Sequence, residues 1–406
     1  MGRFNIEDKK VVAGIDLGAT NVRCLIGTLS VNELTLAGSS SIPHKGLYKG
    51  RIVNMKETSS ALQKAIEEAE VIAGLQVSQL FLGMSGDHHV FSSQGMSIIS
   101  SQQVTGDDLN KAVETAKAVS LPTGHRLLHV LPKSFTVDRE GPFFNPLGLS
   151  GLRLETSVMI ISIPETNVQN ALQCLRYAGC SARGLILQPL ATSLAVLTEN
   201  EKKSGTCVLD IGQDQTSLTV FINARVHHIS SLCIGGEDFT HDLMSELKIP
   251  RDLAEKIKME YGDISPRAEW ENKETIEDLQ KWDINTDEKS INTILSTRAE
   301  LLFEEAKQTL KSLSYFDKLE EGFILTGGGS ALKGIVETAR YFMGKPVKKA
   351  TIKRFHGMSE LENKNNFATA LGVLCYVQNE NTLDYRSNYS NGKAMKIKRY
   401  LQDLFI

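Results

Sequence analysis

The chain has 406 residues, of which 41% are hydrophobic and 23% charged, and its formal net charge is −3. The length allows two or more domains, the composition is that of a globular protein, and the charge balance argues against a broad nucleic-acid surface. Six scattered cysteines without Cys-x-x-Cys spacing argue against a disulfide framework or a metal site. No signal-peptide pattern or run of roughly 18 apolar residues is present, so we expect a cytoplasmic protein.

The first half of the chain predicts an α/β unit with an inserted module. Its strands are expected at 11–15, 22–26, 34–40 and 80–84, with a helix over 57–72. The inserted module, 85–164, is expected to hold strands over 90–99 and 158–163 and a helix over 107–119. A helix over 167–178, a strand over 185–187, a helix over 191–197 and a polar joint over 199–205 follow.

The second half predicts a similar alternation. Its strands are expected at 206–211, 218–223, 225–233 and 323–325. Its helices are expected at 239–247, 250–261, 291–313 and 367–377, with a polar excursion over 263–290. A glycine run at 326–330 follows the strand over 323–325 and precedes a further helix.

Each half opens with a β-rich run, an Asp-x-Gly turn and small or hydroxylated residues. These turns begin at Asp16 and Asp210, about 190 residues apart in the sequence. Glycine lets backbone N–H groups approach phosphate oxygens, and hydroxyls add donors. The two aspartates imply a cation, Mg²⁺ holding its own waters. A lone Asp-x-Gly turn is ordinarily just a hairpin, but two of them predict a duplicated fold with a nucleotide between the halves.

Two further motifs have competing interpretations. The glycine run at 326–330 opens a helix, which favours an anion, although a flexible loop is the alternative. Glu255 and Lys258 share one helix face by their spacing, and the alternative there is a solvated salt bridge.

In this order the motifs resemble the actin/Hsp70/sugar-kinase superfamily, and more narrowly the FtsA family of bacterial cell-division actin homologues. The stretches that carry the narrower match are 129–132, 145–151, 188–191, 235–243 and 255–262. The resemblance covers nearly the whole chain. It implies an α/β, actin-like (ribonuclease H-like duplicated) fold with two lobes around a nucleotide cleft and an FtsA-type 1C insertion.

The resemblance also implies subdomain bounds and site residues. The subdomains would be 1A (1–84 and 165–203), 1C (85–164), 2A (204–239 and 319–378) and 2B (240–318). ATP would be bound by Asp16, Gly18, Ala19, Thr20, Asn21, Asp210, Gly212, Gln213, Thr216, Gly236, Glu255, Lys258, Gly327, Gly328 and Gly329. Asp16 and Asp210 would hold Mg²⁺ through water. Gln188 matches the position that orients the attacking water, and the alternative is a strand-end amide satisfied by the backbone.

The loops depart from the family pattern at three positions. Many members carry a lysine where this chain has Asn21, and Gln213 and Asp214 replace glycines in the second loop. Asp214 adds a negative charge near the expected phosphates. We therefore expect nucleotide binding with at most slow ATP hydrolysis.

A polar linker over 379–392 leads to a basic amphipathic segment, 393–406. Its membrane-contacting residues are expected to be Lys396, Ile397, Lys398, Arg399, Tyr400, Leu401, Leu404 and Phe405. Apolar side chains on one face and cations beside it are typical of an interfacial membrane anchor. The alternative is a terminal helix docked on the protein itself.

The resemblance implies an ATP-binding scaffold that polymerises at the cytoplasmic face of the inner membrane, at the division site. Its partners would be anionic lipids, further copies of itself, other division proteins and the C-terminal peptide of FtsZ, docked on 240–318; no nucleic acid is expected. The alternatives are a PilM-like pilus-assembly actin homologue and a small-molecule kinase of the same fold. A kinase needs a general base, and no acidic motif in the first half clearly supplies one.

Overall fold

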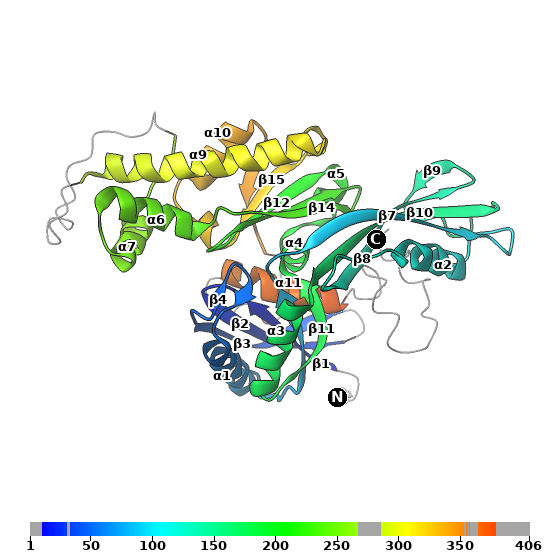
Figure 1. Ribbon diagram of the computed structural model, residues 1–406, viewed down its shortest axis with the longest axis horizontal. Coiled ribbons are helices and arrows are strands. Elements are labelled where there is room, and N and C mark those ends of the chain that lie inside the picture. The colour runs from blue at the N-terminus through cyan, green and yellow to red at the C-terminus, as the bar shows by residue number, and fades with distance from the viewer. Residues whose placement is uncertain are drawn as a thin grey trace, which may run out of the picture. The chain divides into compact units, whose positions relative to one another are not determined.

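The computed structural model describes residues 10–30, 33–266, 286–352, 355, 357 and 364–378 (Figure 1). These residues form two compact units. The first contains the described residues up to Ala195, together with Arg225–His227 and those from 355 onward; the second contains Val196–Ala224 and His228 to residue 352. The expected linker and membrane segment, 379–406, lie outside the described residues.

The first unit is built on a five-stranded sheet in the order β11-β6-β1-β2-β3. Its strands are β1 (Lys10–Leu17), β2 (Asn21–Leu29), β3 (Leu34–Pro43), β6 (Gln79–Met84) and β11 (Ser181–Leu187). Strands β1, β2 and β3 pair antiparallel, whereas β6 runs parallel to β1 and β11 runs parallel to β6. Every strand expected here from the sequence is present.

Among the described residues of the first unit, four helices follow or precede the strands of this sheet. They are α1 (Met55–Ala73), α3 (Glu165–Tyr177), α4 (Gln188–Val196) and α11 (Ala368–Gln378), with short strands β4 (Leu47–Tyr48) and β5 (Arg51–Ile52) and a 3-10 turn, η6 (Lys364–Phe367). Helix α1 packs on β2 and β3, and α11 packs on β1, β2 and β6. Close approach of α11 depends on Gly14, whose missing Cβ would lie 3.0 Å from Val373 Cγ1. Of the segment 319–378 expected in the second lobe, residues 319–352 lie in the second unit, whereas the described residues from 355 onward, which include α11, are part of the first unit.

The inserted module is a four-stranded antiparallel sheet, β7-β10-β8-β9, covered by one helix (Figure 1). Its elements are β7 (His89–Ile98), α2 (Gly106–Lys117), β8 (His125–Val137), β9 (Glu140–Phe143) and β10 (Arg153–Pro164). Helix α2 packs on β7 and β10 through Leu109 and Val113, which are fully buried. The expected strands and helix are present, and β8 and β9 are additions.

The second unit repeats the first sheet's connectivity, in the order β14-β13-β12-β15-β16. The strands of this sheet are β12 (Thr206–Ile211), β13 (Thr216–Ile222), β14 (Arg225–Leu232), β15 (Gly322–Thr326) and β16 (Val347–Lys349). All belong to the second unit except the first three residues of β14. As in the first sheet, the first strand pairs antiparallel with the next strand in sequence and parallel with the fourth. The shared order is that of a duplicated fold.

Helices of the second unit pack on this sheet and on one another. They are α5 (Glu199–Ser204), α6 (Gly236–Leu247), α7 (Arg251–Tyr261), α9 (Glu288–Ser312) and α10 (Ile335–Met343), with 3-10 turns η3 (Phe316–Lys318) and η4 (Gly328–Ala331). The long helix α9 runs beside α6 and α7 (Figure 1). Arg298 of α9 holds Asp242 of α6 through two bonds of 2.6 Å. Across the described parts of the chain, no helix combines the length and the apolar character needed to cross a bilayer.

Candidate nucleotide-binding site

The first Asp-x-Gly turn joins β1 to β2 as a closed hairpin. The N–H of Gly18 donates to the carbonyl oxygen of Asn21 at 3.1 Å. A Cβ on Gly18 would lie only 2.9 Å from that oxygen, so the turn requires glycine. Thr20 at the tip is exposed, and Asn21 donates its side-chain amide to Ser41 Oγ at 3.3 Å. The loop therefore presents backbone and hydroxyl groups, while the Asn21 side chain is turned toward β3.

Asp16 and Gln188 form one hydrogen-bonded pair in the first unit. Gln188 Nε2 donates to Asp16 Oδ1 at 2.9 Å and to the carbonyl oxygen of Leu17 at 3.0 Å. Arg23 lies 3.4 Å from the other oxygen of the buried Asp16 carboxylate. The bonds of Gln188 are those of a locally satisfied amide, the second interpretation of this residue; water positioning stays a prediction.

The second turn, between β12 and β13, has the same closure. Here the N–H of Gly212 donates to the carbonyl oxygen of Gln215 at 3.0 Å. Thr216, expected in the turn, is the first residue of β13 and is fully buried. Its hydroxyl donates to the carbonyl oxygen of Ile234 at 2.7 Å. In this structure the Thr216 hydroxyl therefore joins the second hairpin to the segment that precedes α6.

The N-terminus of α6 is fastened to the second turn. The N–H groups of Gly236 and Glu237 donate to the carbonyl oxygens of Gly212 and Gln213, both at 2.8 Å. The Gln213 side chain donates to Glu237, which also accepts two bonds of 2.6 Å from Arg251 of α7. The hydrogen bonds from Arg251 hold the pKa of Glu237 below its usual range. The turn, α6 and α7 are thus one connected assembly.

Lys258 ties α7 back to the start of α6. Its ammonium group donates to Gly236 O at 2.9 Å, to Thr240 Oγ1 at 2.7 Å and to Glu255 Oε2 at 2.8 Å. The Lys258 side chain is only 12% exposed. Glu255 also accepts from Thr240 Oγ1 at 2.5 Å. The structure brings together Gly236, Glu255 and Lys258, as expected, and adds Thr240, which the sequence analysis missed although it lies one helical turn after Gly236.

The glycine run follows β15 and begins η4. Gly327 has φ of +83°, and a Cβ there would collide with Asp210 Oδ1. A Cβ on Gly329 would collide with Ile211, whereas a Cβ on Gly328 meets nothing within 4 Å. The outer two glycines therefore allow the run to lie against the second hairpin, and Gly328 faces open space.

The site residues expected from the sequence thus fall into two clusters. One, in the first unit, comprises Asp16, Gly18, Ala19, Thr20, Asn21 and Gln188. The other, in the second unit, comprises Asp210, Gly212, Gln213, Thr216, Gly236, Glu255, Lys258 and Gly327 to Gly329. In the described ranges, no group of three or more His, Cys, Asp or Glu side chains is arranged to hold a metal ion. The lipid-contacting residues expected between Lys396 and Phe405 lie outside the described residues.

Comparison with known families gives two matches. The family model described as "Cell division protein FtsA" matches residues 207–372, and the model of the SHS2 domain inserted in FtsA matches residues 86–162. A cell division protein FtsA from Neisseria meningitidis serogroup B is 32% identical, over 98% of this chain and 100% of that protein. The resemblance expected from the motifs is confirmed.

Solved structures agree on the fold. The PilM–PilN type IV pilus biogenesis complex matches with a TM-score of 0.65 at 18% identity, covering 90% of this chain and 98% of that one. MreB5 of Spiroplasma citri bound to ADP matches with a TM-score of 0.55 at 12% identity, covering 91% and 98%. Together with the SHS2 match, they confirm the actin-like fold with an insertion.

Proposed function

Because the chain belongs to the FtsA family of cell-division proteins, we propose that it is an ATP-binding, actin-like scaffold that polymerises on the inner membrane. In this role it anchors the FtsZ ring at the division site, on the cytoplasmic face, and recruits later division proteins. The observation that carries the nucleotide part is the repeated sheet order, in which each first strand ends in an Asp-x-Gly hairpin closed by the same backbone bond.

ATP binding is supported by the donor groups of the two hairpins. The backbone around Gly18 and Gly212 would contact phosphates, and Lys258 with Glu255 would face the nucleoside. Gly328 offers an open backbone surface on which a base or ribose can lie. Asp16 and Asp210 would hold Mg²⁺ through water, and the cation would supply positive charge against the phosphates. The MreB5 structure, with ADP bound, is of the same fold.

Slow ATP hydrolysis is expected from the side chains beside the two hairpins. The amide nitrogen of Gln188 is already committed to Asp16 and Leu17, and Asp214 adds negative charge beside the second hairpin. ATP then acts through binding, and we propose that the nucleotide-bound conformation is the one that polymerises.

Membrane attachment is assigned to residues 393–406. Each cation near an anionic surface contributes about 1 kcal/mol, and each partly buried apolar side chain less than the roughly 1.5–3 kcal/mol of full burial. Ordering the segment opposes this gain. One tail therefore binds reversibly, whereas a row of tails on a polymer binds about 10²–10⁴-fold more tightly by avidity.

FtsZ docking is assigned to the helical part of the second unit. Helices α7 and α9 expose Met259 and Leu301, apolar side chains that can anchor a peptide. Titration of a synthetic FtsZ C-terminal peptide against the full chain and a Leu301→Asp variant tests this assignment. We expect weaker binding by the variant, and equal binding would place the peptide elsewhere.

Sedimentation with anionic liposomes tests the proposed function. The full chain and a truncation ending before Lys393 are compared with and without ATP. We expect the full chain to pellet, ATP to increase the pelleted fraction, and the truncation to stay in the supernatant. A full chain that stays in the supernatant under every condition would contradict the anchored-polymer function.

A PilM-like pilus function is the second candidate, because the PilM–PilN complex gives a TM-score of 0.65. The FtsA relationship is favoured by the inserted-domain match at 86–162 and by the 32% identity over 98% of the chain. The kinase alternative is tested by a small-molecule phosphorylation assay, in which we expect no product.

A further inference from the structure

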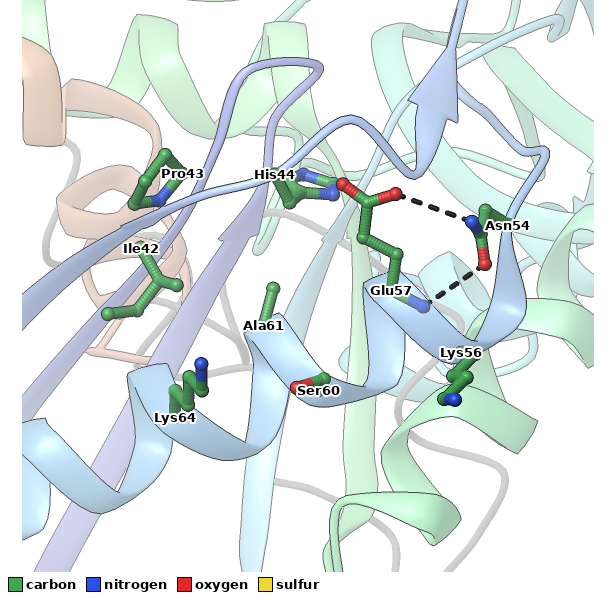
Figure 2. Close-up of a pocket in the computed structure, with 9 residues that line it drawn as sticks. All are labelled: Ile42, Pro43, His44, Asn54, Lys56, Glu57, Ser60, Ala61 and Lys64. Atoms are coloured by element: carbon green, nitrogen blue, oxygen red, sulfur yellow. Dashed lines mark hydrogen bonds between the residues drawn. The ribbon is translucent and has the colours of Figure 1, made fainter.

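His44 lies in the connection between β3 and β4 and is nearly buried, with 6% of its surface exposed. It lines a pocket of about 350 Å³ with Asn54, Glu57, Ser60 and Lys64 of the first turns of α1 and the residue before it. Figure 2 shows His44 beside Glu57, at the end of the pocket away from Lys64. Sequence analysis did not single this histidine out.

Two hydrogen bonds join His44 to the first Asp-x-Gly turn. Its ring Nε2 lies 2.8 Å from the carbonyl oxygen of Gly18, and its backbone N–H donates to the carbonyl oxygen of Thr20 at 2.9 Å. These carbonyls flank Ala19. The N–H groups of Ala19 and Thr20 have no hydrogen-bond partner within the described part of the chain. The turn is therefore held by its carbonyls, and its two central N–H groups are left for a ligand.

The neighbours of the ring specify its tautomer. The N–H of Gly46 donates to Nδ1 at 3.2 Å, so Nδ1 must carry a lone pair. Nε2 faces the carbonyl oxygen of Gly18, which can only accept, so Nε2 must carry the hydrogen. The neutral ring with its proton on Nε2 satisfies both contacts.

The segment that follows His44 is hydrogen-bonded to the start of α1 and to the residues just before it. The N–H groups of Val53 and Asn54 donate to the carbonyl oxygen of Gly46 at 2.9 and 3.2 Å. The N–H of Lys45 donates to Glu57 Oε1 at 2.6 Å. A Cβ on Gly46 would collide with Thr58, so this segment lies tightly against the helix. The start of α1 thus holds the backbone of Gly46, whose N–H orients the His44 ring. The ring in turn holds the carbonyl of Gly18 in the Asp-x-Gly turn.

We propose that His44 is a positioning residue of the first phosphate loop. The carbonyl of Gly18 and the N–H of Ala19 share one trans peptide plane and point in opposite directions, so by holding that carbonyl His44 turns the Ala19 N–H toward an anionic phosphate. Its backbone N–H holds the far end of the turn at the carbonyl of Thr20. The part of this inference that concerns phosphate rests on the proposed nucleotide function; the part that concerns loop order does not.

Matched amide variants test it. The amide of His44→Gln can reach the place of Nε2 and donate to Gly18, whereas the shorter side chain of His44→Asn cannot. His44→Phe keeps an aromatic ring and the backbone bond to Thr20, but loses both side-chain hydrogen bonds, to Gly18 and to Gly46. Ser60→Ala and Lys64→Ala change the same pocket without touching the turn and serve as controls. Two quantities are measured: the Kd of ATP, and the exchange rate of backbone amides over 14–25 in the ligand-free protein.

We expect His44→Asn and His44→Phe to weaken ATP binding about three- to tenfold, the effect of one lost hydrogen bond, and to speed amide exchange. His44→Gln and the two controls should match the wild type in both measurements. Unchanged exchange and affinity in His44→Asn and His44→Phe, or equal losses in His44→Gln, would overturn the proposal. If the wild type binds no ATP, the proposed nucleotide function fails, and the exchange rates alone decide whether His44 orders the turn.

Discussion

At the residue scale, the glycines of the run at 326–330 have different roles: one is open to a ligand, and the others pack against the second hairpin. Gly328 faces open space, whereas Gly329 lies against Ile211. The sequence shows three equivalent glycines after a strand, and nothing in it distinguishes them. The distinction comes from β12, which is over 100 residues away in the chain and pairs with β15. Long-range packing of this kind leaves no local pattern, so its consequences could not be predicted from the sequence.

We predict that alanine destabilises the protein at Gly329 and leaves its stability nearly unchanged at Gly328. Gly329→Ala should lower the free energy of unfolding by about 1–3 kcal/mol, because its Cβ overlaps Ile211. Gly328→Ala should change it by less than about 0.5 kcal/mol. Urea unfolding without nucleotide measures both. Equal destabilisation by the two variants would contradict the packing described for the run.

Lys258 gives a second residue-scale prediction. Lys258→Met should destabilise the protein by about 1–3 kcal/mol and weaken ATP binding, since it removes the ammonium group that donates to Gly236 O, Thr240 Oγ1 and Glu255. Lys256 lies two residues earlier with half of its side chain exposed, so Lys256→Met should cost less than about 0.5 kcal/mol. Urea unfolding and ATP titration of both variants provide the comparison.

At the element scale, helices and strands with a clear hydrophobic pattern were predicted from the sequence, and those without one were missed. Helix α1, which has a clear period, was predicted to within two residues at each end. The ends of β2, β3, α6 and α9 were missed by up to three residues, the start of β11 by four and the start of β10 by five. Helix α5 was expected as a polar joint because it lacks an apolar face, although its start carries a capping box of Thr198 and Glu201. Strand β8 was missed because it contains Pro132, and a proline argues against a strand in the sequence. In the structure Pro132 pairs with Val158 of β10, next to a register shift between the two strands.

The assembly of the second turn, α6 and α7 predicts a pH dependence. The Arg251 hydrogen bonds lower the pKa of Glu237, so its contribution to stability is fully present above the unfolded pKa of about 4.3. That contribution is lost as pH falls through the lower folded pKa. We expect the difference in unfolding free energy between wild type and Glu237→Gln to be constant above about pH 5 and to shrink below about pH 4. A pH-independent difference would show that ionised Glu237 adds nothing to this assembly.

At the scale of the whole molecule, two Asp-x-Gly turns in one chain were sufficient to predict a duplicated fold, and the two sheets share one strand order. The sequence did not predict that the chain returns to the first unit with α11. That helix is apolar all round and nearly all buried, so its pattern carries no information on which sheet it covers. Only the contacts with β1, β2 and β6 assign it.

Equilibrium binding of ATP to the full chain and to Gly328→Asp tests the central claim most directly. The variant places a negative charge where the nucleotide is proposed to lie; apart from the adjoining residues of the chain, none of the described residues comes within 4 Å of the new Cβ. We predict that the wild type binds ATP, that Gly328→Asp does not, and that both unfold at the same temperature without nucleotide. Equal affinity of the two proteins for ATP would contradict the site.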